Sequence, residues 1–150
     1  MELEEVDIKK VLEETLSLTE RQLKSSGVTI ERKWEYGTYT VNGSADSLKQ
    51  VFLNIIINAR SAMDGGGHLT VSLGHRDNDV VIGFCDTGPG IPPELVSRIF
   101  EPFFTTKGDQ GTGLGLSVCH GIIKSYRGSI TYKDNNEGSC FEITLPLLPD

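Results

Sequence analysis

Amide side chains recur along one stripe of a helix predicted in the middle of the chain. Gln50, Asn54 and Asn58 are four residues apart, and Ser61 follows on the same stripe. Asparagine is a poor residue for a helix interior, and a buried amide without partners costs roughly 1–3 kcal/mol. We therefore expect this stripe to face a polar ligand. The alternative is a solvated helix face, although such a face would normally carry Lys and Glu.

A carboxylate at the end of an apolar run is the second candidate for chemistry. Asp86 follows VVIGFC and precedes Thr87, Gly88, Pro89 and Gly90. Glycines let the backbone approach closely, so a carboxylate beside them can accept hydrogen bonds from an amino group of a flat ligand. An aspartate that only stabilises a tight turn is commoner, and this motif alone does not separate the two cases.

Closely spaced glycines begin another predicted helix, in the sequence GTGLGL at residues 111–116. Free backbone N–H groups and the positive end of the helix dipole can bind an anion there, and glycines leave the approach open. The stretch lacks the Lys-Ser/Thr of a Walker loop, and no strand directly precedes it as in a dinucleotide-binding fingerprint. Phosphate binding and a purely structural helix start both stay open on this motif alone.

Apolar periodicity and turn residues predict the elements that must position these groups. Helices are expected at about residues 6–26, 45–63, 94–100 and 111–127. Asp7 is expected to cap the first of them. Strands are expected at 28–36, 39–41, 68–75, 79–85, 129–133 and 139–147. Each successive pair of strands is expected to form an antiparallel hairpin, the first pair around a turn at Gly37.

These elements predict one domain over residues 1–150. Strand pairs alternate with helices, so the expected fold is a two-layer α/β sandwich. Its sheet should be mixed but mostly antiparallel, and three main helices should cover one face. A chain of 150 residues can bury roughly 70% of its unfolded surface, which is sufficient for one core.

Composition narrows the class of protein. There are 14 Lys and Arg against 21 Asp and Glu, a net charge of −7, which argues against binding of nucleic acid or of an anionic membrane surface. The three cysteines are widely spaced in apolar runs, so we expect reduced core thiols rather than a disulfide or a metal site. No run approaches the ~20 apolar residues of a membrane helix. We expect a soluble, intracellular chain.

Four segments together carry a resemblance to a known family. NIIINA, DTGPGIP, IFEPFFTTK and GTGLGL follow one another in this order. In order and approximate spacing they resemble the N, G1, F and G2 boxes of the ATP-binding catalytic domain of bacterial sensor histidine kinases, most closely the nitrogen-regulation sensor type. The resemblance covers essentially the whole chain. It implies the Bergerat-type ATP-binding fold shared by gyrase, Hsp90, histidine kinases and MutL.

The resemblance also implies roles for individual residues. Asn58 would offer its amide oxygen to Mg²⁺, and Asn54 would support the metal waters or phosphates as a catalytic residue, with Ser61 also at the nucleotide site. Asp86 would accept from the adenine amino group, Gly88 and Gly90 would shape the floor, and Ile91 would pack on the base. The residues assigned to the ATP lid and the triphosphate are Phe104, Thr106, Lys107, Gly111, Thr112, Gly113, Leu114, Gly115 and Leu116. Among them Lys107 is the second catalytic candidate, although many family members have a longer lid with an arginine.

The activity implied is transfer of the ATP γ-phosphate to a histidine on a separate dimerisation domain. The partner that would then receive the phosphate is a cognate response regulator. His68, His75 and His120 do not lie in the setting of such an acceptor, so the isolated domain should not phosphorylate itself. We expect this domain to be monomeric. The chain would be cytoplasmic, without direct membrane contact, although its parent protein can be membrane-anchored.

Two alternatives stay open beside this reading. One is a free-standing serine kinase of the anti-sigma-factor type, or an ATPase, of the same superfamily. Such proteins generally carry a Glu four residues before the metal asparagine as general base, where this chain has Asn54. The other is a degenerate module that only mediates protein contacts, which four intact boxes disfavour.

Overall fold

The computed structural model describes residues 3–102, 115–135 and 138–149. The elements follow one another as β1 (Glu4–Asp7), α1 (Ile8–Ser25), β2 (Val28–Trp34), β3 (Thr40–Gly43), α2 (Ala45–Ala62), β4 (Gly67–Arg76), β5 (Asp79–Asp86), α3 (Pro93–Val96), α4 (Gly115–Ser125), β6 (Ser129–Asn135) and β7 (Gly138–Pro146). None of the helices within these ranges is long and apolar enough to cross a membrane.

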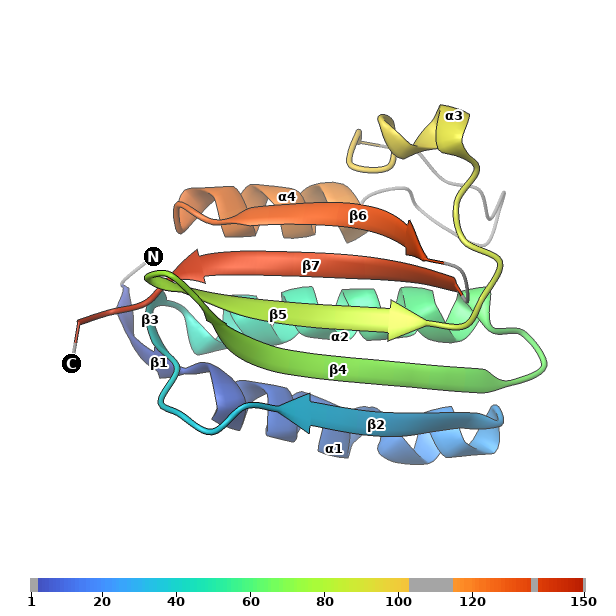
Figure 1. The fold of residues 1–150 in the computed structure, drawn as a ribbon, viewed down its shortest axis with the longest axis horizontal. Helices are drawn as coiled ribbons and strands as arrows, with labels where there is room; N and C mark the ends of the chain where they lie inside the picture. Colours follow the sequence, from blue (N-terminus) through green and yellow to red (C-terminus); the bar gives the residue numbers. More distant parts are fainter. Residues whose placement is uncertain (1–2, 103–114, 136–137, 150) are drawn as a thin grey trace.

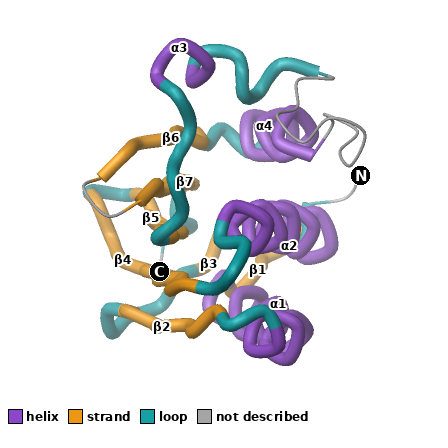
Figure 2. The backbone as a smooth tube through the Cα atoms, turned by 90° about the vertical axis from the view of Figure 1, so that its right-hand side faces the viewer, coloured by secondary structure: helices purple, strands orange, loops and turns teal. Residues whose placement is uncertain are grey.

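A five-stranded sheet forms one layer of the molecule. Its strand order is β2-β4-β5-β7-β6, in which β2 and β4 run parallel and every other neighbouring pair runs antiparallel. The helices α1, α2 and α4 form the second layer on one face, as the two perpendicular views show (Figures 1 and 2). The predicted two-layer α/β sandwich with a mixed, mostly antiparallel sheet is therefore confirmed.

Alternation along the strands explains why the helices cover only one face. Every second residue of β4, Leu69, Val71 and Leu73, is buried, while the residues between them are not. The same alternation continues in β7 from Phe141 through Ile143 to Leu145. Because successive side chains of a strand point to opposite faces, these residues bring the apolar face of the sheet against the helices. The core therefore lies between the two layers.

The helix that carries the amide stripe is well defined at its start. The Ser44 hydroxyl accepts from the backbone N–H of Ser47 at 3.3 Å, which caps α2. Most of its apolar side chains are buried, with Ile57 as an exposed exception, and Phe52 contacts Phe84 of β5 with ring centroids 5.8 Å apart. This packing orients α2 along β5, the strand that ends at Asp86 (Figure 1).

The predicted hairpin between residues 28–36 and 39–41 is wrong. Strand β2 pairs with β4 in parallel, and β3 pairs instead with β1, a strand of four residues whose last two, Val6 and Asp7, were expected to begin the first helix. Helix α1 begins at Ile8, where Asp7 caps it by accepting from the Lys10 N–H at 3.3 Å. The predicted cap is thus confirmed, and β1 forms because the backbone before the cap is extended and pairs with a non-local strand.

Candidate functional site

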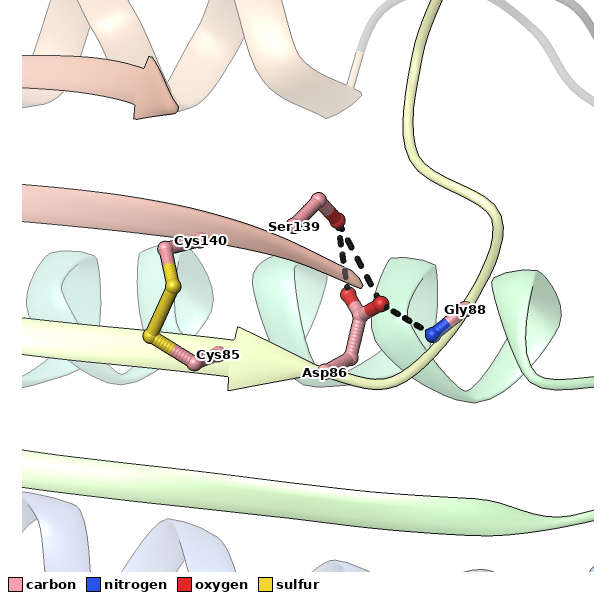
Figure 3. The surroundings of a disulfide bond; sticks show 5 residues. All are labelled: Cys85, Asp86, Gly88, Ser139 and Cys140. Atoms are coloured by element: carbon pink, nitrogen blue, oxygen red, sulfur yellow. Dashed lines mark hydrogen bonds between the residues drawn. A yellow bond between two sulfur atoms is a disulfide. The ribbon is translucent and has the colours of Figure 1, made fainter. Parts of the chain in front are cut away.

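Asp86 is the last residue of β5 and lies on the face of the sheet that the helices cover. Its side chain is only 6% exposed. One carboxylate oxygen accepts from the Gly88 N–H at 2.9 Å, and the Ser139 hydroxyl reaches both oxygens at 3.3 and 3.2 Å (Figure 3). Ser139 faces Asp86 because the two residues are register partners in the pair of β5 and β7. A carboxylate offers about four acceptor sites, so it can still receive another donor.

The surroundings of Asp86 act on its ionisation in opposite directions. Burial raises its pKa above the ordinary value of an aspartate, and this is the largest effect. The Gly88 N–H and the Ser139 hydroxyl oppose it, because both donate to the charged form. The net shift is upward. The site therefore holds a carboxylate that is poorly solvated and gains much from a further donor.

The glycine-rich turn after β5 packs tightly against neighbouring elements. A Cβ on Gly88 would lie 2.8 Å from the Ala62 carbonyl oxygen, in the last turn of α2, and 3.0 Å from an Asp86 carboxylate oxygen. Gly90 has a φ of +80° and would place a Cβ 2.8 Å from an Asp134 carboxylate oxygen of β6. Gly88 requires glycine because a Cβ would meet the backbone of α2, and Gly90 requires it because of its positive φ. The turn therefore packs between α2 and β6. Ile91, at its end, is partly buried against the core.

The predicted amide residues of α2 differ in their surroundings. Asn54 and Asn58 are partly buried, whereas Gln50 and Ser61 are exposed. The Asn54 amide nitrogen donates to the sulfur of Cys119 in α4 at 3.7 Å. Since nitrogen and oxygen lie on opposite sides of an amide group, the Asn54 oxygen is directed away from the thiol. Two partly buried amides one helical turn apart thus lie on the side of α2 that α4 approaches.

Cys119 is itself a buried thiol and takes part in this contact. It donates to the Val51 carbonyl at 3.8 Å, and burial raises its pKa to about 11. The thiol therefore stays protonated at neutral pH, which makes it a packing partner of Asn54 rather than a nucleophile. Its expected role as a reduced core thiol is confirmed.

The expectation of reduced thiols is wrong for the other two cysteines. Cys85 and Cys140 form a disulfide, with Cα atoms 4.0 Å apart (Figure 3). They are 55 residues apart in the sequence and become register partners only when β5 pairs with β7. Neither spacing nor composition reveals this register. Cys85 directly precedes Asp86 and Cys140 directly follows Ser139, so the disulfide lies beside this pair on the opposite face of the sheet.

The structure describes only some of the residues that the sequence predicts to bind phosphate. Gly115 is the first residue of α4, and Leu116 packs against the core from the first turn. The other predicted residues of this group lie outside the described residues: Phe104, Thr106, Lys107, Gly111, Thr112, Gly113 and Leu114.

Sequence reasoning did not single out Ser139 or Tyr132 as site residues. Ser139 is 4% exposed and occupies a core-facing position of β7, in phase with Phe141. The signal in the sequence that could have identified Ser139 was a hydroxyl in a strand whose alternate residues are otherwise apolar. Tyr132 is in phase with Ile130 on β6, and its ring packs on Phe141 at 5.2 Å while its hydroxyl accepts from the Ile91 N–H at 2.7 Å. Both residues connect the last two strands to the Asp86 turn.

The donor set of the described residues restricts the kind of metal that the site can take. Within the described ranges, no three His, Cys, Asp or Glu side chains gather as they do in a metal centre. What α2 offers is amide oxygen, from Asn58 and Asn54. Mg²⁺ prefers oxygen, keeps several waters and takes few protein ligands beyond substrate phosphates. The residues present therefore fit a magnesium ion that a bound phosphate would share.

Known proteins resemble this chain in both sequence and structure. Residues 43–149 match the family described as histidine kinase-, DNA gyrase B-, and HSP90-like ATPase. Sporulation kinase A of Bacillus subtilis (strain 168) is 38% identical over 144 residues, which cover 95% of this chain and 24% of that protein. The chain thus spans about a quarter of the length of this relative.

Solved structures of a histidine kinase share the whole fold. The catalytic domain of histidine kinase ThkA has a TM-score of 0.91 at 31% identity and covers 99% of this chain and 100% of its own. ThkA in complex with the response regulator protein TrrA has a TM-score of 0.85 at 27% identity, with 98% of this chain and 42% of that chain covered. Since the family match spans most of the sequence and the likeness to a kinase catalytic domain spans nearly all of it, the chain belongs to the histidine kinase-, DNA gyrase B- and HSP90-like ATPase family.

Proposed function

We propose that this chain binds ATP with Mg²⁺ and donates the γ-phosphate to a histidine on a separate helical dimerisation domain, as the catalytic part of a two-component sensor kinase. One observation carries the proposal. A buried carboxylate, Asp86, is oriented by two donors at the start of a glycine turn, in a chain whose fold is that of a histidine kinase catalytic domain. ATP is the ligand that the ATPase family name implies.

Adenine recognition follows from the surroundings of Asp86. The adenine amino group would donate to the carboxylate oxygens, which already accept from Gly88 and Ser139. The net charge of the acceptor makes this bond stronger than one between neutral groups. Ile91, at the end of the turn, would pack on the flat face of the base. A base that presents a carbonyl oxygen at this position would place an acceptor against the carboxylate instead of a further donor, which disfavours such bases relative to adenine.

The phosphates would lie between α2 and the start of α4. The amide oxygens of Asn58 and Asn54 would hold the magnesium ion, which neutralises charge on the phosphates. Phosphoryl transfer needs little covalent chemistry from the protein, so positioning of the nucleotide is the main task of the chain. Lys107 and the main chain of 111–116 are the further candidates to hold the phosphates, on the strength of the sequence motif.

None of the histidines has the surroundings of a phosphate acceptor. His68 hydrogen-bonds Thr29, His75 stacks on Tyr39 at 4.4 Å, and His120 stacks on Phe100 at 5.4 Å. Each imidazole thus has a structural partner within the domain. The acceptor histidine would therefore come from a separate domain, and the chain alone should not acquire phosphohistidine.

The rival function, a serine kinase or an ATPase of the same superfamily, needs a general base near the phosphates. At Asn54, four residues before Asn58, the chain has an amide that cannot accept a proton in this role. Its nitrogen is moreover engaged with Cys119. Steady ATP hydrolysis at an enzyme-like rate by this chain would reverse the ranking.

The partners follow from the same proposal. The solved complex of ThkA with the response regulator TrrA supports a cognate response regulator as the final phosphate acceptor. The dimerisation domain would contribute the histidine, and both would meet the chain in the cytoplasm.

Calorimetric titration with ATP in the presence and absence of Mg²⁺ tests the nucleotide site. The wild-type chain should bind ATP, more tightly with Mg²⁺. Asp86→Asn should weaken binding by about ten- to a hundredfold, because it removes the charged acceptor. Asp79→Asn, at the first residue of the same strand, is the matched control and should bind as the wild type does. Equal affinities for Asp86→Asn and the control would contradict the proposed adenine site.

A further inference from the structure

The hydroxyl of Tyr132 connects strand β6 to the turn that follows Asp86. It accepts from the Ile91 N–H at 2.7 Å and donates to a carboxylate oxygen of Asp134 at 2.5 Å. Asp134 lies two residues further along β6 and so points to the same side of the strand. Because the tyrosine proton is directed at Asp134, the lone pairs of the oxygen are left for Ile91. A chain of hydrogen bonds of this kind strengthens each of its members.

The turn is therefore held at both of its ends. At its start the Gly88 N–H donates to Asp86, and at its end the Ile91 N–H donates to Tyr132. Between these bonds Gly90 packs so closely that a Cβ would lie 2.8 Å from the Asp134 carboxylate and 3.2 Å from the Tyr132 hydroxyl. The position of Ile91 relative to Asp86 is thus set by β6.

Tyr132 is also connected to the other side of the site. Its ring packs on Phe141 of β7 at 5.2 Å, and Ser139, two residues earlier on that strand, donates to Asp86. Desolvation raises the pKa of Tyr132 above its ordinary value, and the bond to Asp134 adds to this. The phenol consequently keeps its proton at neutral pH and continues to donate to Asp134.

We propose that Tyr132 is a positioning residue for the adenine site, which holds Ile91 against the base through the Ile91 N–H and depends on Asp134 to orient its hydroxyl. The inference rests on the proposed function, since it takes the nucleotide base to lie between Asp86 and Ile91. Tyr132 touches no nucleotide in this account. It acts on binding through the backbone of the turn.

Titration of wild type, Tyr132→Phe and Tyr126→Phe with ADP and with ATP tests the proposal. Tyr126 is the matched control, because its hydroxyl also accepts a backbone N–H, that of Ser44 at 3.2 Å, but at the start of α2. Tyr132→Phe should weaken ADP and ATP by the same factor, about three- to tenfold, since the effect lies at the base and not at the phosphates. The ATP affinity of Tyr132→Phe should depend on Mg²⁺ concentration as that of the wild type does. Tyr126→Phe should bind both nucleotides as the wild type does.

Two variants of Asp134 separate orientation of the hydroxyl from packing of the ring. Asp134→Ala removes the acceptor of the tyrosine proton and should weaken ADP by about two- to fivefold. Asp134→Asn keeps an acceptor oxygen and should stay within about twofold of the wild type. These variants leave the Tyr132 ring in place, so they test the proposal even if Tyr132→Phe folds poorly. Faster hydrogen exchange of the Ile91 amide should accompany each loss.

The outcomes separate this inference from the proposed function. A wild-type chain that binds neither ADP nor ATP would overturn the function. Normal binding by the wild type with unchanged affinity in Tyr132→Phe and Asp134→Ala would overturn only the role of Tyr132. An equal loss in Tyr126→Phe would also overturn it, because the effect would then be one of general stability.

Discussion

Asp86, the last residue of β5, combines burial with neutral hydrogen-bond partners. Its carboxylate is 6% exposed, yet its partners are a backbone N–H and a hydroxyl rather than a cation. Burial of a charge without a counter-ion costs free energy, which the upward shift of its pKa expresses. A structural aspartate at a turn would be more stable if solvated. The burial of this carboxylate, despite its cost in free energy, is therefore better explained by a ligand that donates to it.

The raised pKa of Asp86 predicts how ATP binding depends on pH. Its pKa in the folded chain lies above the ordinary value, so the folded chain holds this proton to a higher pH than the unfolded chain does. The adenine amino group needs the ionised form. As the pH falls through the raised pKa, affinity should decline by about tenfold per pH unit. Calorimetry between neutral and acidic pH measures this decline.

The control for this dependence is the Asp86→Asn variant. It has no carboxyl to protonate, so the decline should be absent from its weaker binding. The same shift makes stability greater below the ordinary pKa and lower above the raised one, and Asp86→Asn should therefore be as stable as the wild type at neutral pH, or more so. A wild-type affinity that falls only at the ordinary pKa of an aspartate would contradict the assigned surroundings.

Asn58 gives the second prediction at this scale. Asn58→Ala should abolish most of the increase in ATP affinity that Mg²⁺ produces, because it removes a protein oxygen from the ion. The affinity measured with chelator present should change little. Titrations with and without Mg²⁺ check this difference. A loss of the same size without Mg²⁺ would assign Asn58 to the nucleotide rather than to the ion.

The residues that the sequence alone could indicate were those whose type conflicts with their position. Asparagines in an apolar helix and an aspartate after a buried strand are such conflicts. Ser139 was equally informative in its alternating strand, but a single hydroxyl is easily accommodated in a core and carries a weaker signal. Tyr132 could not be found in this way, because an aromatic ring suits its position and only the folded structure brings its hydroxyl to Ile91.

At the scale of elements, the pairing of β5 with β7 has the largest consequences. One register places Asp86 opposite Ser139 and, on the other face, Cys85 opposite Cys140. The disulfide therefore joins the same two strand ends that carry Asp86 and Ser139, the residues of the proposed adenine site. Periodicity predicted both strands, but not their pairing, since side-chain alternation is local and register is set by contacts between distant segments.

The disulfide predicts both a thiol count and a change in stability. The unfolded, unreduced chain should titrate with one free thiol, Cys119. Cys140→Ser should lower the free energy of unfolding by about 2–4 kcal/mol, because the bond closes a sequence separation of 55 residues. Urea titrations under non-reducing conditions measure this. A reductant should lower the stability of the wild type to that of the variant, and three free thiols in the unreduced wild type would contradict the bond.

Helices were predicted more accurately than strand partners. The expected helix at 45–63 is observed at Ala45–Ala62, with Ser44 as its cap. Capping residues and apolar periodicity are local signals, so they can be recognised in the sequence without knowledge of the fold. Strand β1 was missed because three of its four residues, Glu4, Glu5 and Asp7, are charged and exposed. Only its pairing with β3 makes it a strand.

At the scale of the whole molecule, the layered arrangement brings together groups from distant parts of the chain. Strand β5 supplies Asp86, β7 supplies Ser139, and α2 supplies the amides, all near the end of the sheet where the turn packs on Ala62. The fold class could be predicted because alternating helices and strand pairs allow few architectures. The parallel pair of β2 and β4 could not, since it joins strands separated by α2.

The net charge of −7 also becomes intelligible at this scale. An acidic chain can hold a triphosphate only if the neutralising groups are local. In the proposed site these are main-chain N–H groups, a magnesium ion and Lys107, and the adenine is held by a carboxylate. Acidic residues elsewhere therefore do not conflict with a phosphate ligand.

The most direct test of the account is transfer of labelled phosphate from γ-labelled ATP to a supplied dimerisation domain that carries the acceptor histidine. With Mg²⁺, the wild-type chain should produce acid-labile, base-stable phosphohistidine on that domain and none on itself, and Asp86→Asn should lower the rate by at least about tenfold at low ATP concentration. Acid-labile phosphohistidine on this chain alone, or rapid hydrolysis of ATP without transfer, would contradict it.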